Sequence, residues 1–325
     1  MTKPRVFVTR MILDQGLKMI QEFCDAEIWL DELPPSRDIL LERVQGMHGL
    51  LTLLTDRIDA EVMQAAGKDL RVISNHAVGY DNIDIAAANR LGITVGNTPG
   101  ILTDATADFT FSLLLSMARR ITEADQYVRS GQWKTWGPAL LLCADISAAT
   151  LGIIGFGRIG QAVARRAKGF NMQVIFHDPN RIENATGLDA HPVDLDTLLR
   201  RSDFISIHTP LTTQTHHMIN ADSFNKMKPN AILVNTARGS VVDPTALYTA
   251  LKHNCIQAAA LDVTEPEPLP MDSPLLELDN LIICPHIASA SNSTRARMSL
   301  MAAENLIAGL KGEKLPNCVN PEIFV

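Results

Sequence analysis

The feature that most constrains this chain is a glycine-rich turn that begins at residue 155. The run Gly155-Phe-Gly157-Arg-Ile-Gly160 follows the apolar residues 151–154 and opens a helix-like stretch. In such a turn the three glycines permit a sharp bend, let the backbone approach a pyrophosphate, and let the helix pack closely on the strand. Because this turn begins so far from residue 1, the first hundred residues are expected to form an α/β unit of their own.

Short β-rich runs alternate with helix-like stretches along the chain. Before the glycine turn the β-rich runs are 6–8, 26–30, 49–54, 71–74 and 93–95, and the helix-like stretches are 14–23, 36–44, 59–66 and 84–91. From residue 150 onward the β-rich runs are 151–154, 173–177, 204–208, 231–235, 258–262 and 281–284. Alternation of this kind predicts parallel sheets with helices on both faces.

The predicted fold class is therefore α/β, with two doubly wound parallel-sheet domains. Residues 100–289 are expected to form an NAD(P)-binding Rossmann domain that is inserted in a flavodoxin-like substrate domain. Residues 1–99 form the first part of that substrate domain, and residues 290–325 return to it as a crossing helix and tail. Apolar residues at helical spacing predict one continuous helix over 104–130 and another over 294–310.

An acidic residue stands where a ribose-binding carboxylate is required. The β-rich run 173–177 is followed by Asp178, 18 residues after Gly160. A carboxylate there can accept both ribose hydroxyls and would repel a 2′-phosphate, which favours NAD over NADP. Arg181 lies three residues further on and could soften this preference, so NADP stays an alternative. Arg158 is expected to reach the pyrophosphate.

Three polar segments follow the later β-rich runs, and each carries one candidate catalytic side chain. Arg238 lies just after run 231–235, Glu267 follows run 258–262, and His286 follows run 281–284. Carboxyl ends of parallel strands meet at one edge of a sheet, so these side chains can converge there. Glu265 competes with Glu267 for the acidic role, and the sequence favours Glu267. Arg238 alone could equally be a structural ion-pair partner, and His286 alone a core histidine.

The three side chains suit the binding of a carboxylate and the transfer of a proton. An arginine can clamp a carboxylate with two parallel hydrogen bonds and polarise a neighbouring carbonyl. A histidine can protonate the developing alkoxide and take the proton back in the reverse direction. A glutamate that is hydrogen-bonded to this histidine would fix its tautomer. His216 and His217 are interpreted as a solvated pair, and the sequence indicates no metal site.

Over nearly its whole length the sequence resembles the D-2-hydroxyacid dehydrogenases, and within them the glyoxylate/hydroxypyruvate reductases. The resemblance rests on residues 78–84, 97–99, 104–108, 155–160, 236–239, 262–268 and 285–286. It implies that Arg238, Glu267 and His286 are the substrate arginine, the acid and the catalytic histidine. It also implies that the backbone around Val78 and Gly79 binds the substrate carboxylate. The implied activity is that of an oxidoreductase that converts a small 2-keto acid to the D-2-hydroxy acid.

The resemblance implies further contacts with the cofactor and with a second copy of the chain. Besides the glycines, Arg158 and Asp178, the cofactor-binding residues would be Thr106, Phe156, Ile159, Thr209, Thr236, Ala237, Arg238, Asp262, His286 and Ala288. A homodimer is expected through the cofactor domain, and the loop that contains Trp136 would reach the partner subunit. Ala288 stands where the family commonly has glycine, a departure that leaves the exact substrate open.

Composition narrows the possible partners. The chain has 325 residues, with 29 Lys and Arg against 36 Asp and Glu, a net charge of −7. An acidic chain of this kind is not expected to bind nucleic acid or an anionic membrane surface. Five scattered cysteines without a C-x-x-C pattern favour a reduced, cytoplasmic setting. Two alternatives stay open: a 3-phosphoglycerate or 2-ketogluconate type of dehydrogenase, and a non-enzymatic dinucleotide-sensing corepressor.

Overall fold

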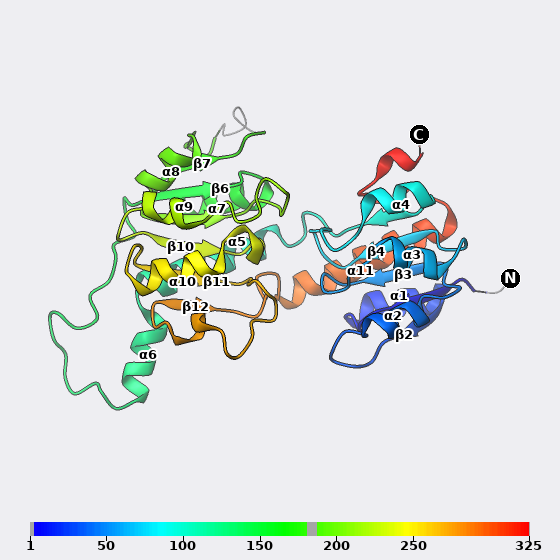
Figure 1. Cartoon of the computed structure of the whole chain (residues 1–325), viewed down its shortest axis with the longest axis horizontal. Coiled ribbons are helices and arrows are strands. Elements are labelled where there is room, and N and C mark those ends of the chain that lie inside the picture. Colours follow the sequence, from blue (N-terminus) through cyan, green and yellow to red (C-terminus); the bar gives the residue numbers. More distant parts are fainter. Residues whose placement is uncertain (1–2, 181–186, 325) are drawn as a thin grey trace. The chain divides into compact units, whose positions relative to one another are not determined.

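The structure is a computed structural model that describes residues 3–180 and 187–324. The chain divides into two compact units (Figure 1). Unit 1 comprises Met1–Leu102 and Ala290–Val325, and unit 2 comprises Thr103–Ser289. Unit 2 is therefore inserted in the sequence of unit 1. In the described part of the chain, no helix is long and apolar enough to cross a membrane.

Unit 1 is built on a five-stranded parallel sheet with the order β2-β1-β3-β4-β5. This is the flavodoxin-like order. Its strands are β1 (Arg5–Val8), β2 (Asp25–Ile28), β3 (Gly49–Thr52), β4 (Val72–Asn75) and β5 (Thr94–Gly96). Its longer helices are α1 (Asp14–Phe23), α2 (Arg37–Arg43), α3 (Ala60–Ala66), α4 (Ile85–Leu91) and α11 (Asn292–Lys311).

Alternation of side chains along the strands gives this sheet two apolar faces. In β1, Val6 and Val8 pack with residues of α1 and α11, whereas Phe7 packs with residues of α2, α3 and α4. This is the pattern expected of successive side chains in a strand. The helix starts are also fixed locally, because Ser36, Asp59 and Asp84 each accept a backbone N–H of the helix that follows.

Unit 2 is built on a seven-stranded parallel sheet with the order β12-β11-β10-β9-β6-β7-β8. Its strands are β6 (Thr150–Ile154), β7 (Gln173–His177), β8 (Ala190–Pro192), β9 (Phe204–Ile207), β10 (Ile232–Asn235), β11 (Ala258–Leu261) and β12 (Leu281–Ile283). The chain winds outward in one direction from β6 and in the other from β9, which is the Rossmann arrangement. The boundary between β6 and β9 is thus the topological switch point, where open parallel sheets bind ligands.

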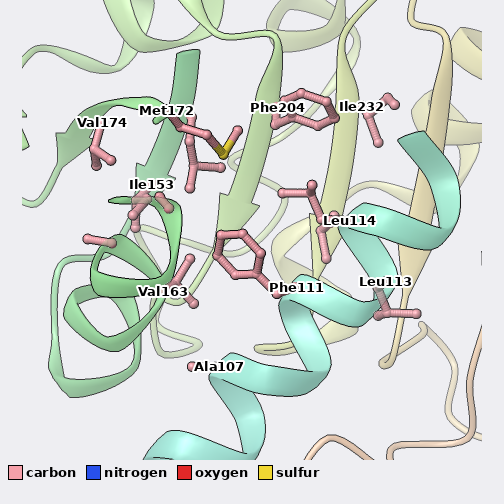
Figure 2. Close-up of a cluster of buried hydrophobic side chains, with 14 of the residues drawn as sticks. Ala107, Phe111, Leu113, Leu114, Ile153, Val163, Met172, Val174, Phe204 and Ile232 are labelled. Carbon is pink, nitrogen blue, oxygen red and sulfur yellow. The ribbon is translucent and has the colours of Figure 1, made fainter. Parts of the chain in front are cut away.

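Helices cover both faces of this second sheet. On one face, α5 (Thr103–Ala118) and α7 (Arg158–Lys168) pack on the strands. Figure 2 shows Phe111 and Leu114 of α5 among Ile153, Phe204 and Ile232. The other face is covered by α8 (Leu195–Arg201), α9 (Ala221–Lys226) and α10 (Pro244–Lys252). Both sheets are parallel and covered on both faces, which confirms the predicted fold class.

The structure differs from the sequence prediction in two elements. The helix predicted over 104–130 is broken in two, because α5 ends at Ala118 and α6 runs over Ile121–Arg129. Arg120 between them has a φ of 51°, and its guanidinium donates to both carboxylate oxygens of Glu123 at 2.7 and 2.6 Å. That local bond stabilises the break, which apolar spacing alone does not reveal. The short edge strand β8, which ends in a proline, was not predicted.

Candidate active site

The glycine turn lies between β6 and α7, at the switch point of the second sheet. Gly155 has a φ of 88°, and a Cβ on it would lie 2.7 Å from the backbone of His208 at the end of β9. A Cβ on Gly160 would lie 2.2 Å from the carbonyl oxygen of Gly155. A Cβ on Gly157, in contrast, would have no protein atom within 4 Å. Two of the glycines therefore serve packing, and the third keeps space open beside the start of the helix.

The residues around this turn fit a dinucleotide. Helix α7 has Gly157 as its N-cap and no side-chain cap, so its first N–H groups are directed at this space. Asp178 lies directly after β7, and its Oδ2 accepts the backbone N–H of Phe156 at 2.9 Å. The acid is thereby held against the glycine turn. Arg158 is exposed at the first position of α7, and Arg181 lies outside the described residues.

Phe156 contributes to the site through its backbone alone. Its side chain is fully buried and stacks on Phe176, with ring centroids 3.9 Å apart. The ring belongs to the core of unit 2, so a ligand at the glycine turn can meet only the main chain of this residue.

Threonine hydroxyls connect helix α5 to the end of β10. Thr110 donates its hydroxyl to the carbonyl of Thr106 at 2.8 Å, and its oxygen lies 2.9 Å from that of Thr236. Thr106 and Thr236 are both buried. Thr209 follows β9, and its backbone N–H is among the atoms nearest to Gly155. The predicted cofactor residues Thr209 and Thr236 thus lie just past the carboxyl ends of two neighbouring strands.

The turn that carries Arg238 is held by the last residue of β10. Asn235 is buried, its Oδ1 accepts the N–H of Ala237 at 3.0 Å, and its Nδ2 donates to the carbonyl of Arg238 at 2.8 Å. One amide therefore spans the whole turn. The sequence analysis did not single out Asn235, although an asparagine at a strand end is typical of such turns.

His286 and Glu267 form a direct hydrogen bond. His286 Nδ1 lies 2.6 Å from Glu267 Oε1, and the second carboxylate oxygen accepts the N–H of Thr264 at 3.3 Å. An ionised Glu267 requires the hydrogen on Nδ1, so Nε2 is the atom that would exchange a proton with a substrate. Glu265, the competing acid, instead contacts His217 and Ser240, each at 2.6 Å.

The charge of Glu267 is maintained by its neighbours. Burial alone would raise the pKa of this carboxyl. The hydrogen bond from His286, with a further contribution from the positive charge of Arg238, outweighs burial and holds the pKa below its usual value. His286 and Glu267 thus form a hydrogen-bonded pair, and the positive charge of Arg238 favours the ionised form of the same carboxyl. This arrangement can hold an anion and transfer a proton.

Asp262 positions the backbone around His286. Its Oδ1 accepts the N–H of Ile287 at 2.8 Å, its Oδ2 accepts the N–H of Ala288 at 2.7 Å, and its carbonyl accepts the N–H of His286 at 2.8 Å. His286 has a φ of 56°, a conformation that is costly for a residue with a Cβ. Burial raises the pKa of Asp262, and the two N–H bonds partly offset this effect. The predicted cofactor residue Asp262 therefore also supports the turn that presents the histidine.

The predicted carboxylate-binding turn lies in unit 1. Asn97 Nδ2 donates to the carbonyl of Val78 at 2.7 Å, and Asn75 Nδ2 donates to the carbonyl of Gly79 at 2.9 Å. In a trans peptide the N–H points away from the C=O. The N–H groups of Gly79 and Tyr80 therefore each point away from the asparagine that holds the carbonyl of the same peptide.

Comparison with known proteins identifies the family that the sequence led us to expect. Residues 111–288 match the family model described as D-isomer specific 2-hydroxyacid dehydrogenase, NAD binding domain. A glyoxylate reductase of Korarchaeum cryptofilum is 54% identical over 323 residues, which cover 99% of this chain and 97% of that protein.

Solved structures agree over the same length. One from Thermus thermophilus gives a TM-score of 0.90 at 47% identity, covering 97% of this chain and 99% of the other. The NADPH-dependent glyoxylate/hydroxypyruvate reductase of Sinorhizobium meliloti, in complex with NADP and malonate, gives a TM-score of 0.84 at 31% identity, covering 98% and 97%. The chain belongs to the D-isomer specific 2-hydroxyacid dehydrogenase family, and residues 111–288 match the NAD-binding domain of that family.

Proposed function

We propose that this protein reduces a small 2-keto acid, of the glyoxylate or hydroxypyruvate class, to the corresponding D-2-hydroxy acid. The observation that carries the proposal is the 2.6 Å contact between His286 and Glu267, with Arg238 close enough to influence the same carboxylate. A full-length relative at 54% identity carries the name glyoxylate reductase, which supports the same substrate class.

In this mechanism the chain binds the substrate, holds its carbonyl and supplies the proton. A reduced nicotinamide cofactor, when bound, supplies the hydride. Arg238 binds the substrate carboxylate and polarises the neighbouring carbonyl. His286 donates the proton on Nε2 to the carbonyl oxygen as negative charge develops there. Glu267 accepts the hydrogen bond from Nδ1–H and stabilises the ring while it carries positive charge.

Two features of the first unit favour a small substrate. Residues 48–56 and 74–81 contain no lysine or arginine, although a phosphorylated substrate would need additional cations. The turn at Val78 and Gly79 offers backbone N–H groups, which suit a carboxylate. We therefore prefer glyoxylate or hydroxypyruvate to a 3-phosphoglycerate type of substrate. That the backbone at Val78 and Gly79 binds the substrate carboxylate stays a prediction.

For the cofactor we propose a preference for NADH over NADPH. Asp178 is held beside the glycine turn by the N–H of Phe156, where a carboxylate would accept ribose hydroxyls and repel a 2′-phosphate. The relative from Sinorhizobium meliloti is described as NADPH-dependent, so NADPH is the alternative that the experiment below has to distinguish.

The decisive experiment is a spectrophotometric survey of NADH and NADPH consumption with glyoxylate, hydroxypyruvate, pyruvate and 2-ketogluconate. We expect the highest kcat/KM with glyoxylate or hydroxypyruvate. His286→Ala should lower single-turnover hydride transfer by at least about 100-fold while cofactor affinity is retained. If none of the four acids is turned over although the dinucleotide binds tightly, the alternative of a non-enzymatic, dinucleotide-sensing corepressor would be favoured. Equal turnover in His286→Ala would refute its catalytic role.

We further propose that the protein is a homodimer formed through unit 2. Helix α6 and the loop that follows it are labelled or traced in Figure 1. The helix has no buried residue, and apolar side chains on the helix and the loop are exposed. These are Ile121, Val128, Trp133, Trp136, Leu140 and Leu142. Sedimentation velocity should show a dimer that Ile121→Asp with Val128→Asp dissociates and the exposed control Lys134→Ala does not. A monomeric unmodified chain would refute the proposal.

A further inference from the structure

A second histidine–glutamate contact lies outside the catalytic set. His217 Nε2 lies 2.6 Å from Glu265 Oε2, and His216 Nε2 lies 3.8 Å from Glu265 Oε1. The two imidazole rings stack with centroids 4.0 Å apart. One ligating atom from each of the three residues lies within 4.8 Å of the others, and these residues form the one such group among the described residues. The pair that the sequence analysis interpreted as solvated is partly exposed, at 53% and 34% of the two side chains, and it also contacts Glu265.

The backbone brings both rings to the same carboxylate. His217 has a φ of 49°, so the chain turns between the two histidines and the rings can stack rather than point apart. The N–H of His217 donates to the carbonyl of Ser240 at 2.8 Å, and the N–H of Ile219 donates to the carbonyl of Val241 at 3.1 Å. These bonds attach the histidine turn to the segment that follows Arg238. The cluster is thus built on a fixed frame within unit 2.

Glu265 is oriented from a second direction. The hydroxyl of Ser240 donates to its Oε1 at 2.6 Å. The carboxylate side chain is about one-third exposed, and that of His216 is 53% exposed. One side of the cluster therefore faces solvent, while a hydrogen-bonded serine supports the other. Support of a ligating carboxylate by an outer hydrogen bond is characteristic of metal sites.

We propose that His216, His217 and Glu265 bind a divalent cation of the zinc class. Two imidazole nitrogens and one carboxylate oxygen form a donor set that zinc uses, with water in the fourth position. Calcium and magnesium prefer oxygen ligands alone, so the two histidines select against them.

Zinc binding requires small shifts of all three side chains, because the ligand atoms lie between 2.6 and 4.8 Å apart. Zinc ligands at about 2.0–2.1 Å in a tetrahedron lie roughly 3.3 Å apart, so the 2.6 Å contact between His217 and Glu265 has to lengthen. If the His217 ring is neutral, a hydrogen on Nε2 moves to Nδ1; if the ring is protonated, the proton on Nε2 passes to solvent. The nitrogen and the carboxylate oxygen then each bind the cation. No oxidation or reduction takes place.

The site is tested with ZnCl2 and the full chain without an affinity tag. Competition with a chromophoric chelator should give one zinc per chain, and Co2+ in its place should give the visible bands of a tetrahedral nitrogen–oxygen site. His216→Ala and Glu265→Gln should each weaken zinc binding at least about ten-fold, and Ser240→Ala by about ten-fold. The matched control His253→Ala, an exposed histidine at the end of α10, should bind as the unmodified chain does.

Two results would overturn the proposal. One is an unmodified chain that takes up no zinc. The other is a His216→Ala chain that binds zinc with unchanged affinity, which would place the cation elsewhere, for example at His286 and Glu267. Thermal unfolding of each variant without metal shows that it is folded. Because His216 is on the surface and outside the catalytic set, its variant should keep the turnover of the unmodified chain in the absence of metal.

Discussion

Replacing Asp262 by Asn tests whether a buried carboxylate holds His286, the proposed proton donor, in place. Both oxygens of Asp262 accept backbone N–H groups, from Ile287 at 2.8 Å and from Ala288 at 2.7 Å. Asparagine has the same shape but only one acceptor oxygen, so its NH2 group must face one of these donors. One buried backbone N–H then loses its partner, and the turn that carries His286 has to move.

The cost follows from these two bonds. A hydrogen bond to an ionised group contributes about 1.5–3 kcal/mol, and an unpaired buried N–H costs about 1–3 kcal/mol. We expect Asp262→Asn to lower the free energy of unfolding by about 2–4 kcal/mol, since relaxation of the turn recovers part of the loss. A displacement of His286 by about 1 Å is sufficient to slow proton transfer about 100-fold.

Urea unfolding followed by circular dichroism measures the first effect, and single-turnover reduction of the keto acid measures the second. Asp272→Asn is the matched control, because Asp272 is exposed and the same substitution there should change the free energy of unfolding by less than about 0.5 kcal/mol. If Asp262→Asn were as stable as this control and equally active, Asp262 would not support the His286 turn.

Four further substitutions test the glycine turn, Asp178 and a buried histidine. Gly160→Ala should destabilise the protein by about 1–3 kcal/mol, because the new Cβ would lie 2.2 Å from a backbone oxygen. Gly157→Ala should leave urea unfolding unchanged but weaken NADH binding in fluorescence titration. If Gly157→Ala destabilised the protein and Gly160→Ala did not, the roles assigned to these two glycines would be contradicted. Asp178→Asn keeps an acceptor for the N–H of Phe156 but loses the charge, so the ratio of kcat/KM for NADPH to that for NADH should rise at least about ten-fold, or 1.4 kcal/mol. Burial, with a smaller contribution from the charge of Arg295, lowers the pKa of His76 from 6.5 to about 4. The unfolded chain therefore binds a proton that the folded chain does not between these values, and stability is lost as pH falls below 6.5, by about 2 kcal/mol at pH 5. His76→Gln should abolish this part of the pH dependence of urea unfolding, and an unchanged pH dependence would show that His76 is not responsible.

The sequence predicts the two sheets because each strand is a short apolar run between polar turns. In unit 2 every strand except the edge strand β8 is such a run, and buried parallel strands need no alternation with polar residues. The break between α5 and α6 could not be read in the same way. It depends on the conformation of Arg120 and on its bond to Glu123, whereas the apolar spacing continues across both helices.

The candidate catalytic side chains could be named from sequence, but their supports could not. Arg238 and His286 stand out because each lies three residues past an apolar strand, and the resemblance to the family implies the role of Glu267. Asn235 acts through both ends of its amide, and Asp262 through two backbone N–H groups of a turn more than twenty residues away. Such contacts depend on three-dimensional proximity, which one sequence does not contain. The cluster at Glu265 was missed for the same reason, since 48 residues separate it from His217.

The convergence of the site in unit 2 is a consequence of strand register. Asn235 of β10 pairs with Leu261 of β11, which pairs with Ile283 of β12, so three strand ends lie level at one edge of the sheet. The ladder continues past the strands, because the N–H of Asp262 donates to the carbonyl of Asn235 at 2.9 Å and the N–H of His286 to the carbonyl of Asp262 at 2.8 Å. Arg238 and His286 each come three residues after a strand end, and these strand ends lie at the same edge of the sheet.

A shift of one residue in the register of β12 would turn its side chains to the opposite face and displace His286 from this edge. The register is held by backbone hydrogen bonds from the N–H of Cys284 to the carbonyl of Leu261 and from the N–H of His286 to the carbonyl of Asp262. The positive φ of His286 then directs its ring back toward the loop that carries Glu267. The strain of that conformation is offset by the two N–H bonds to Asp262, the last residue before the chain leaves the ladder. The strand pairing that builds the sheet therefore also determines which side chains can meet in the candidate active site.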